Sequence, residues 1–127
     1  MRLLLDTSTL IWAIRDPSKL GDTTRNAIAE PANTVFVSAA SAWEVAIKRA
    51  TGKLDAPGNL RDWIAEAPFE ELPITVEHAT AAGALPLHHR DPFDRMLVAQ
   101  AQLENLTLVA HDDEIARYDV SVIDARA

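Results

Sequence analysis

Hydrophobic and polar residues follow two patterns that alternate along the chain. Short runs of β-forming residues predict strands at residues 2–6, 34–38, 69–74, 106–110 and 121–124. Longer segments with apolar residues at helical spacing predict helices at residues 8–15, 39–54, 59–67, 76–85 and 92–104, with Gly52 as the expected stop of the second. The alternation predicts an α/β fold with three α/β/α layers and a mostly parallel central sheet of about five strands.

The composition is that of one globular domain, residues 1–127, of which 48% are hydrophobic. The chain has no cysteine, which excludes disulfides, thiolate nucleophiles and cysteine-bound zinc, and which suits a reducing compartment. The apolar run in "MRLLLDTST" is too short for a signal peptide or a membrane span. We therefore expect a cytoplasmic protein that does not enter a membrane.

The net charge is −7, from 19 acidic residues against 12 lysines and arginines. This balance argues against loose binding of nucleic acid through a broad basic face. A polyanionic substrate would require something to neutralise the nearby acids, such as a divalent metal ion. A basic protein partner would also complement this surface.

Several acids fall where the carboxyl ends of the predicted strands meet. Asp6 ends the first strand, Glu44 lies in the first turns after the second, and Asp112 and Asp113 follow the fourth. Asp94 opens the helix that leads into the fourth strand. Ligands of such sheets bind at this edge, so the acids converge if the first strand lies between the second and the fourth.

Each acid also has an explanation in helix capping. Asp6 could cap the helix that follows the first strand, and Asp112 could cap the segment "DEIARY" after the fourth. Glu44 completes a capping-box pattern with Ser41, and Asp94 completes the analogous pattern with Asp91, which Pro92 follows at the first helical position. Capping alone would not require the acids to share one edge, because close carboxylates repel one another unless a cation is present.

Oxygen ligands without cysteine suit Mg²⁺ or Mn²⁺, which bind through a few carboxylates and through phosphate oxygens of a substrate. One or two such ions at a phosphodiester can activate the attacking water and stabilise the leaving oxygen. The acids therefore indicate metal-assisted phosphodiester hydrolysis.

The chain resembles the PIN-domain ribonucleases, and specifically the VapC toxins of bacterial toxin–antitoxin pairs, in four segments: "LLLDTSTLIWAI", "FVSAASAWEVAIKRATGKL", "LPITVEHATAAGALPLHHRDPFDRMLVAQA" and "LTLVAHDDEIARYDVSVID". The resemblance covers nearly the whole chain. It implies a PIN-like domain, an endoribonuclease that uses Mg²⁺ or Mn²⁺, a cognate antitoxin that covers the site, and a homodimer.

By match of motif, the resemblance places Asp6, Glu44 and Asp94 at the three main metal-binding and catalytic positions of the family. Asp112 takes the more variable fourth position, and Asp113 is an alternative to it.

Two residues depart from the family pattern. Ser8 stands where close relatives often carry a histidine, which could change how the mouth of the site contacts RNA. Ala110 stands where a threonine is usual before the fourth acid, which leaves that metal position less defined.

Among the basic residues, Arg95 is our candidate for contacting RNA phosphate, together with Ser8, whereas Lys48 is spaced to pair with Glu44 on one helix. His88 and His89 could contact RNA or metal, but we expect both to lie in a solvated loop, and a Mg²⁺ site does not favour imidazole. The sequence gives no partner for His78 or His111. The aromatic residues, which fall on or beside apolar helical faces, are expected in the core or at an interface: Trp12, Trp43 and Phe93.

Other functions fit the sequence less well. A phosphohydrolase of the haloacid dehalogenase type needs a second acid two residues after Asp6, where this chain has Ser8. A receiver-like domain needs an acid pair after its first strand and an acceptor aspartate after its third. The remaining alternative is a catalytically weak PIN-like protein that binds an antitoxin or RNA.

Overall fold

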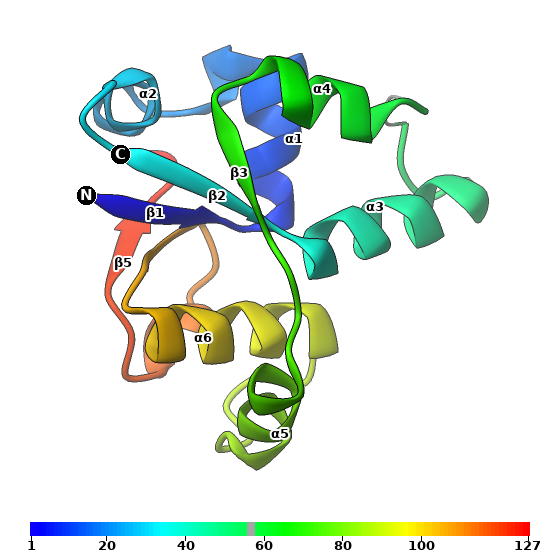
Figure 1. Cartoon of the computed structure of the whole chain (residues 1–127), viewed down its shortest axis with the longest axis vertical. Helices are drawn as coiled ribbons and strands as arrows, with labels where there is room; N and C mark the ends of the chain where they lie inside the picture. The colour runs from blue at the N-terminus through cyan, green and yellow to red at the C-terminus, as the bar shows by residue number, and fades with distance from the viewer. Residues whose placement is uncertain (56–57) are drawn as a thin grey trace.

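The computed structural model describes residues 1–55 and 58–127. Its elements follow one another in the order β1 (Arg2–Leu5), α1 (Thr7–Arg15), η1 (Pro17–Lys19), α2 (Asp22–Ala29), β2 (Thr34–Ser38), α3 (Ala39–Ala50), α4 (Leu60–Glu66), β3 (Phe69–Leu72), α5 (Val76–Ala84), α6 (Pro92–Glu104), β4 (Thr107–Ala110), η2 (Ile115–Arg117) and β5 (Val122–Asp124) (Figure 1). Each of the predicted strands and helices is present, with ends shifted by a few residues.

The strands form one parallel sheet in the order β3-β2-β1-β4-β5. The register of β1 pairs Leu4 with Phe36 of β2 on one side and with Leu108 of β4 on the other. The first strand therefore lies between the second and the fourth, as the convergence of the acids requires.

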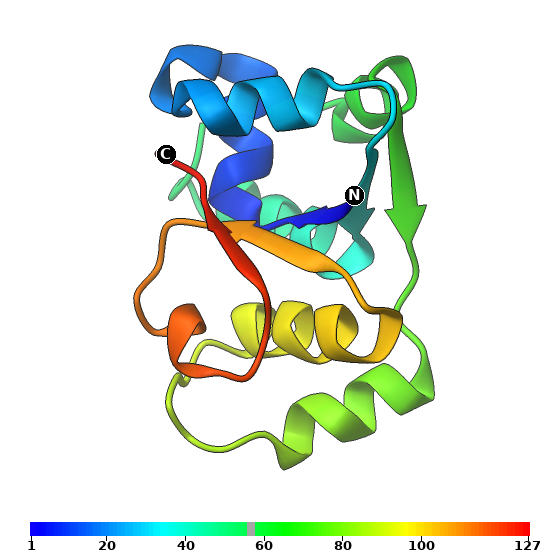
Figure 2. The ribbon, with the colours of Figure 1, turned by 90° about the vertical axis from the view of Figure 1, so that its left-hand side faces the viewer.

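Helices cover both faces of the sheet, which confirms the predicted three-layer architecture (Figure 2). Side chains of a strand alternate between the faces. Leu3 and Leu5 of β1 belong to a core cluster shared with α1, α3 and α4, whereas Leu4 belongs to a second cluster shared with α6. All three leucines are fully buried, so β1 is the centre of both cores.

One helix, α2, was not predicted. It begins after Gly21, which has no side chain to cap it, and its first turns carry Thr23, Thr24 and Asn26, which are weak helix formers. Gly21 is required by close packing, because a Cβ atom there would overlap the backbone carbonyl of Ala127. Within the described ranges, none of the helices is both long and apolar enough to cross a bilayer.

Candidate active site

Asp6 lies directly after β1 and is the N-cap of α1. Its Oδ1 accepts a hydrogen bond from the backbone N–H of Thr9 at 2.8 Å, so its explanation as a cap is correct. Only 6% of its surface is exposed. Burial raises the pKa of Asp6 by more than the hydrogen bonds from Thr9 lower it, and the charges of Asp112 and Glu44 raise it further. The carboxylate is thus a cap that also lies close to other acids.

The N-terminus of α3 differs from its prediction. The N-cap is Ser38, whose hydroxyl accepts a hydrogen bond from the backbone N–H of Ala40 at 3.0 Å. Ser41 and Glu44 lie inside the helix, so the predicted capping box between them is wrong. Glu44 consequently has no capping role.

The carboxylate of Glu44 is held from two sides, although only 4% of the residue is exposed. Its Oε2 lies 2.6 Å from Nζ of Lys48, which confirms the predicted pair within the helix. Its Oε1 accepts a hydrogen bond from the hydroxyl of Thr7 on α1. The hydrogen bond to Glu44 raises the pKa of Lys48, and further acids nearby support this shift.

Asp91 and Asp94 have separate roles at the start of α6. Oδ1 of Asp91 accepts hydrogen bonds from the backbone N–H groups of Phe93, at 2.8 Å, and Asp94, at 3.1 Å, so Asp91 is the N-cap as predicted. The Asp94 carboxylate is directed elsewhere, with Oδ2 2.8 Å from Nε2 of His89. Burial raises the pKa of Asp94 to about 6, against the lowering effect of the hydrogen bond from His89.

Asp112 follows β4 and is half-buried. Its Oδ1 accepts a hydrogen bond from the backbone N–H of Glu114 at 2.8 Å, and its Oδ2 lies 3.5 Å from Nε2 of His89. The neighbouring Asp113 is exposed. The structure therefore directs Asp112, rather than Asp113, toward the other acids.

His89 lies in a different environment from the one that the sequence predicted. We expected it in a solvated loop, but its side chain is only 18% exposed and its Nε2 lies between carboxylates of Asp94 and Asp112. Burial acts to lower the pKa of His89, but the hydrogen bond to Asp94 and the surrounding negative charges outweigh it and raise the pKa. The available signal was a histidine five residues before a candidate metal ligand.

The four predicted acids line one cleft of about 320 Å³ at the carboxyl ends of β1, β2 and β4. The cleft is also lined by Thr7, Ser8, Ile11, Trp12, Lys48, Leu54, Asp91 and His111. The order of the strands in the sheet explains why the acids converge, because β1 lies between β2 and β4 and the three strands are parallel. Lys48 is the one lysine or arginine among these lining residues of the described chain.

The Arg95 guanidinium is bound to the protein itself. It donates hydrogen bonds to the backbone carbonyls of Ala82, Leu85 and Pro86, each at 3.0 Å, and to that of His89 at 3.3 Å. A further bond of 3.2 Å reaches the Tyr118 hydroxyl. Arg95 thus fastens the segment before α6, and its predicted contact with RNA stays a prediction.

His78 and His111, for which the sequence gave no partner, each lie beside an acid of another element. His78 is buried at the third position of α5, completes a capping box with Thr75, and lies 2.9 Å from Oε1 of Glu104. His111 lies 2.8 Å from Oδ1 of Asp124. These bonds orient both imidazoles toward structural partners rather than toward the four acids.

Trp43 is an exposed aromatic residue. It lies on α3 with 62% of its surface exposed, and its ring packs edge-on against Phe93 of α6 with 5.3 Å between the ring centroids. The exposed position of Trp43 favours the interface that we predicted for these aromatic residues as an alternative to the core.

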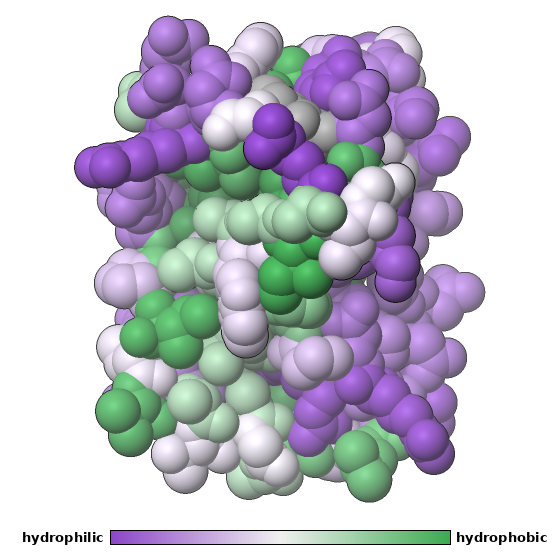
Figure 3. Space-filling view, turned by 90° about the vertical axis from the view of Figure 1, so that its right-hand side faces the viewer, coloured by the Kyte–Doolittle hydropathy of each residue, from purple (hydrophilic) through white to green (hydrophobic). Residues whose placement is uncertain are grey.

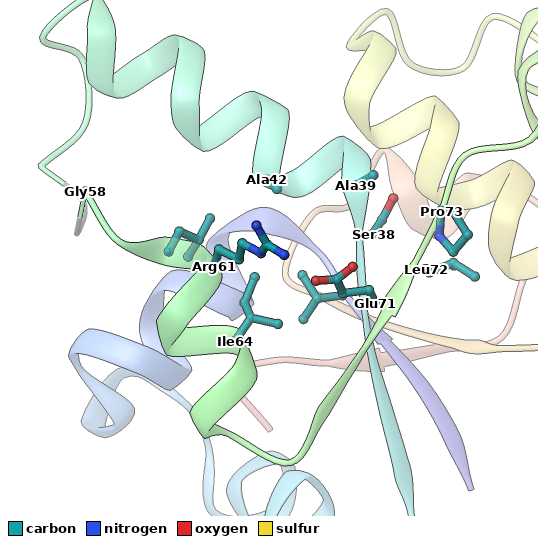
Figure 4. Close-up of a pocket in the computed structure, with 11 residues that line it drawn as sticks. Ser38, Ala39, Ala42, Gly58, Arg61, Ile64, Glu71, Leu72 and Pro73 are labelled. Carbon is teal, nitrogen blue, oxygen red and sulfur yellow. The ribbon is translucent and has the colours of Figure 1, made fainter.

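A larger hollow of about 620 Å³ lies between α3, α4 and β3 (Figure 4). Its lining is mainly apolar, and Arg61 and Glu71 extend over it from opposite sides. None of the four acids lines it in the described part of the chain, so we do not assign the hydrolytic chemistry to this hollow.

The donor set in the acidic cleft fits a hard divalent cation. Mg²⁺ and Mn²⁺ bind carboxylate oxygens and retain several waters. One ligand atom each of His89, Asp94 and Asp112 lies within 4.8 Å of the others. The raised pKa values of Asp6 and Asp94 indicate buried negative charge that a cation would stabilise.

The fold and the cleft define a class: three-layer α/β/α domains with a parallel sheet and an acidic cleft at the carboxyl ends of its strands. The chain belongs to the PIN domain family, which it matches over residues 3–121. A search of curated proteins found no match.

The fold is also similar to those of solved toxin–antitoxin structures. VapBC2 from Rickettsia felis, bound to a DNA fragment from its promoter, has a TM-score of 0.72 at 16% identity, over 97% of this chain and 98% of that chain. DNA-bound VapBC from Salmonella typhimurium has a TM-score of 0.71 at 17% identity, over 98% of both chains. A toxin–antitoxin complex from Klebsiella pneumoniae has a TM-score of 0.65 at 21% identity, over 97% of both chains. At these identities the likeness concerns the fold.

Proposed function

We propose that this protein is a toxin of the VapC type, a metal-dependent endoribonuclease that hydrolyses RNA phosphodiester bonds and is neutralised by a cognate antitoxin. The observation that carries the proposal is the convergence of Asp6, Glu44, Asp94 and Asp112 in one cleft. Membership of the PIN domain family and the similarity to VapBC structures support it. Because the proposed substrate is RNA, the proposed place of action is the cytoplasm.

The four acids would hold Mg²⁺ or Mn²⁺, which when bound supplies an activated water and neutralises charge on the phosphodiester. The chain positions these acids before any ion arrives. Asp6 is fixed by its capping bond, and Glu44 is fixed between Thr7 and Lys48. Such pre-positioned groups lower the cost of ordering the site during the reaction.

The surroundings of the cleft supply contacts for an RNA backbone. Ser8 lies at the exposed side of the cleft and carries a hydroxyl that can donate to a phosphate oxygen. Lys48 carries a positive charge 2.6 Å from the carboxylate of Glu44. We propose Ser8 and Arg95 as substrate contacts on the strength of the sequence prediction, with Lys48 as an additional cation at the cleft.

The proposed protein partner is an antitoxin with a basic segment that lies over the acidic cleft. The net charge of −7 favours such a partner electrostatically, and the similar solved structures are toxin–antitoxin complexes.

We also propose a homodimer. Trp43, Ile47 and Trp63 are exposed large apolar side chains of α3 and α4, which suit a protein interface. The face in Figure 3 carries apolar side chains through its middle and at its lower left, with hydrophilic ones mainly over its upper part and along its right-hand side. Light scattering on the isolated chain tests this part, and a strictly monomeric chain would contradict it.

RNA cleavage by a matched pair of variants tests the enzymatic proposal. Glu44→Gln removes a buried charge of the cleft, whereas Asp113→Asn removes an exposed charge that lies outside the residues lining it. With Mn²⁺ present, we expect the parent and Asp113→Asn to cleave a labelled RNA and Glu44→Gln to lose most of that activity. Cleavage by Glu44→Gln at the parent rate would refute the assignment, and RNA binding by the parent without cleavage would favour the catalytically weak alternative.

A further inference from the structure

We propose that His89 is a direct ligand of the bound metal ion and that its imidazole shifts the preference of the site from Mg²⁺ toward transition-metal ions such as Mn²⁺ and Ni²⁺. The inference rests on the proposed function only in requiring that the acidic cleft binds a divalent cation.

The spacing of the ligand atoms supports direct coordination. Nε2 of His89 lies 2.8 Å from Oδ2 of Asp94 and 3.5 Å from Oδ2 of Asp112. An octahedral ion with ligands at about 2.1 Å places neighbouring ligand atoms about 3.0 Å apart. The two observed distances bracket this value, and one ligand atom from each of the three groups lies within 4.8 Å of the others, so one ion can lie between them.

The backbone of His89 is fastened in place from two other elements. Its N–H donates a hydrogen bond to the hydroxyl of Tyr118 at 3.0 Å, and its carbonyl accepts one from the Arg95 guanidinium at 3.3 Å. The Tyr118 hydroxyl in turn donates to the carbonyl of Pro86 at 2.7 Å. These bonds present the imidazole to the acids, which is the supporting arrangement that a metal ligand requires.

An imidazole ligand distinguishes between cations. Mg²⁺ strongly prefers oxygen ligands, whereas nitrogen ligands are bound more readily along the series from Mn²⁺ to Ni²⁺. A site of carboxylates alone would discriminate less between these ions. The placement of His89 between Asp94 and Asp112 therefore favours a transition-metal ion over Mg²⁺.

A different role for His89 would have the opposite consequence. If the protonated imidazole only neutralises Asp94 and Asp112 while the cleft is free of metal, it competes with every cation that enters. Its removal would then strengthen the binding of Mg²⁺, Mn²⁺ and Ni²⁺ alike. Metal affinity thus separates a ligand from a counter-ion.

The experiment measures metal binding to the full chain without RNA, at one fixed pH. The variants are His89→Ala and, as the matched control, His111→Ala, because His111 lines the cleft and its Nδ1 lies 2.8 Å from Oδ1 of Asp124. We expect His89→Ala to weaken Mn²⁺ and Ni²⁺ binding by at least about tenfold, by analogy with the 10- to 100-fold effects of supporting groups around metal ligands. Mg²⁺ binding should change less, and the control should resemble the parent.

Pulsed electron paramagnetic resonance of the Mn²⁺-loaded parent gives a test that needs no variant. Direct coordination by His89 predicts a ¹⁴N coupling that disappears in His89→Ala and persists in His111→Ala. A parent without this coupling, or a His89→Ala protein that binds all three ions at least as tightly as the parent, would overturn the inference. A parent that cleaves RNA but lacks the coupling would refute this inference alone, whereas one that shows the coupling but cleaves no RNA would refute only the proposed function.

Discussion

Replacement of Asp94 by asparagine should stabilise the metal-free protein at neutral and alkaline pH while removing most of its metal binding. Burial and the charges of Asp91 and Asp6 raise the pKa of Asp94 to about 6 against the effect of its bond to His89. The ionised carboxylate is therefore less stable in the folded protein than in the unfolded chain. The asparagine side chain would keep the shape and an oxygen that accepts a hydrogen bond from His89, without the charge.

The size of the effect follows from proton linkage. The gap between the ordinary pKa of 3.8 and about 6 corresponds to about 3 kcal/mol of unfolding free energy. The Asp94 side chain is only 16% exposed, so solvent screens little of this effect. Because the folded pKa is raised, the folded protein binds more protons than the unfolded chain between these two values. The parent therefore loses stability as the pH rises through this window, and at pH 5 it regains about 1.4 kcal/mol relative to pH 8.

Denaturant melts of the metal-free parent and Asp94→Asn at pH 5 and pH 8 measure this difference. We expect the advantage of the variant to be larger at pH 8 than at pH 5 by the same amount, about 1.4 kcal/mol. Asp113→Asn is the control, because Asp113 is exposed and lies outside the residues that line the cleft. An Asp94→Asn protein that is less stable than the parent at pH 8 would refute the reasoning.

Three further variants separate structural roles from chemical ones. Asp6→Asn should abolish RNA cleavage without lowering the unfolding free energy of the metal-free protein, because asparagine caps a helix equally well and the charge repulsion is relieved. A large loss of stability in denaturant melts would show that Asp6 has a structural role. Asp91→Ala should cost about 1 kcal/mol in the same melts and change cleavage only modestly, and an unchanged stability would contradict its role as a cap. Arg95→Gln should cost about 3 kcal/mol because it removes charged hydrogen bonds to several carbonyls, whereas normal stability with lost RNA binding would assign the residue to RNA.

The parts of the structure that the sequence predicted are set by local patterns. The run of Leu3, Leu4 and Leu5 predicts a strand buried on both faces, and these residues form the centre of the sheet. Asp91 before Pro92 predicts a capped helix, which the structure has. The convergence of the acids followed from these elements, because the ends of neighbouring parallel strands meet at one edge.

The parts that the sequence did not predict depend on contacts between distant residues. His89 reaches the acids because Tyr118, 29 residues away, and Arg95 hold its backbone. The pattern of Ser41 and Glu44 matched a capping box, but the helix already begins at Ala39 and is capped by Ser38, the last residue of the preceding strand. The spacing of residues along the chain identifies side chains that could bond to one another, and tertiary packing determines which of these bonds form.

The metal dependence of RNA cleavage tests the central claim most directly. Purified protein is treated exhaustively with EDTA, dialysed, and incubated with a labelled RNA before and after Mn²⁺ is restored, with Glu44→Gln as the variant that lacks a carboxylate of the cleft. We predict no cleavage without metal, recovery of cleavage with Mn²⁺, and little recovery in the variant. Undiminished cleavage after metal removal, or equal recovery in Glu44→Gln, would contradict a metal-dependent site built from the four acids.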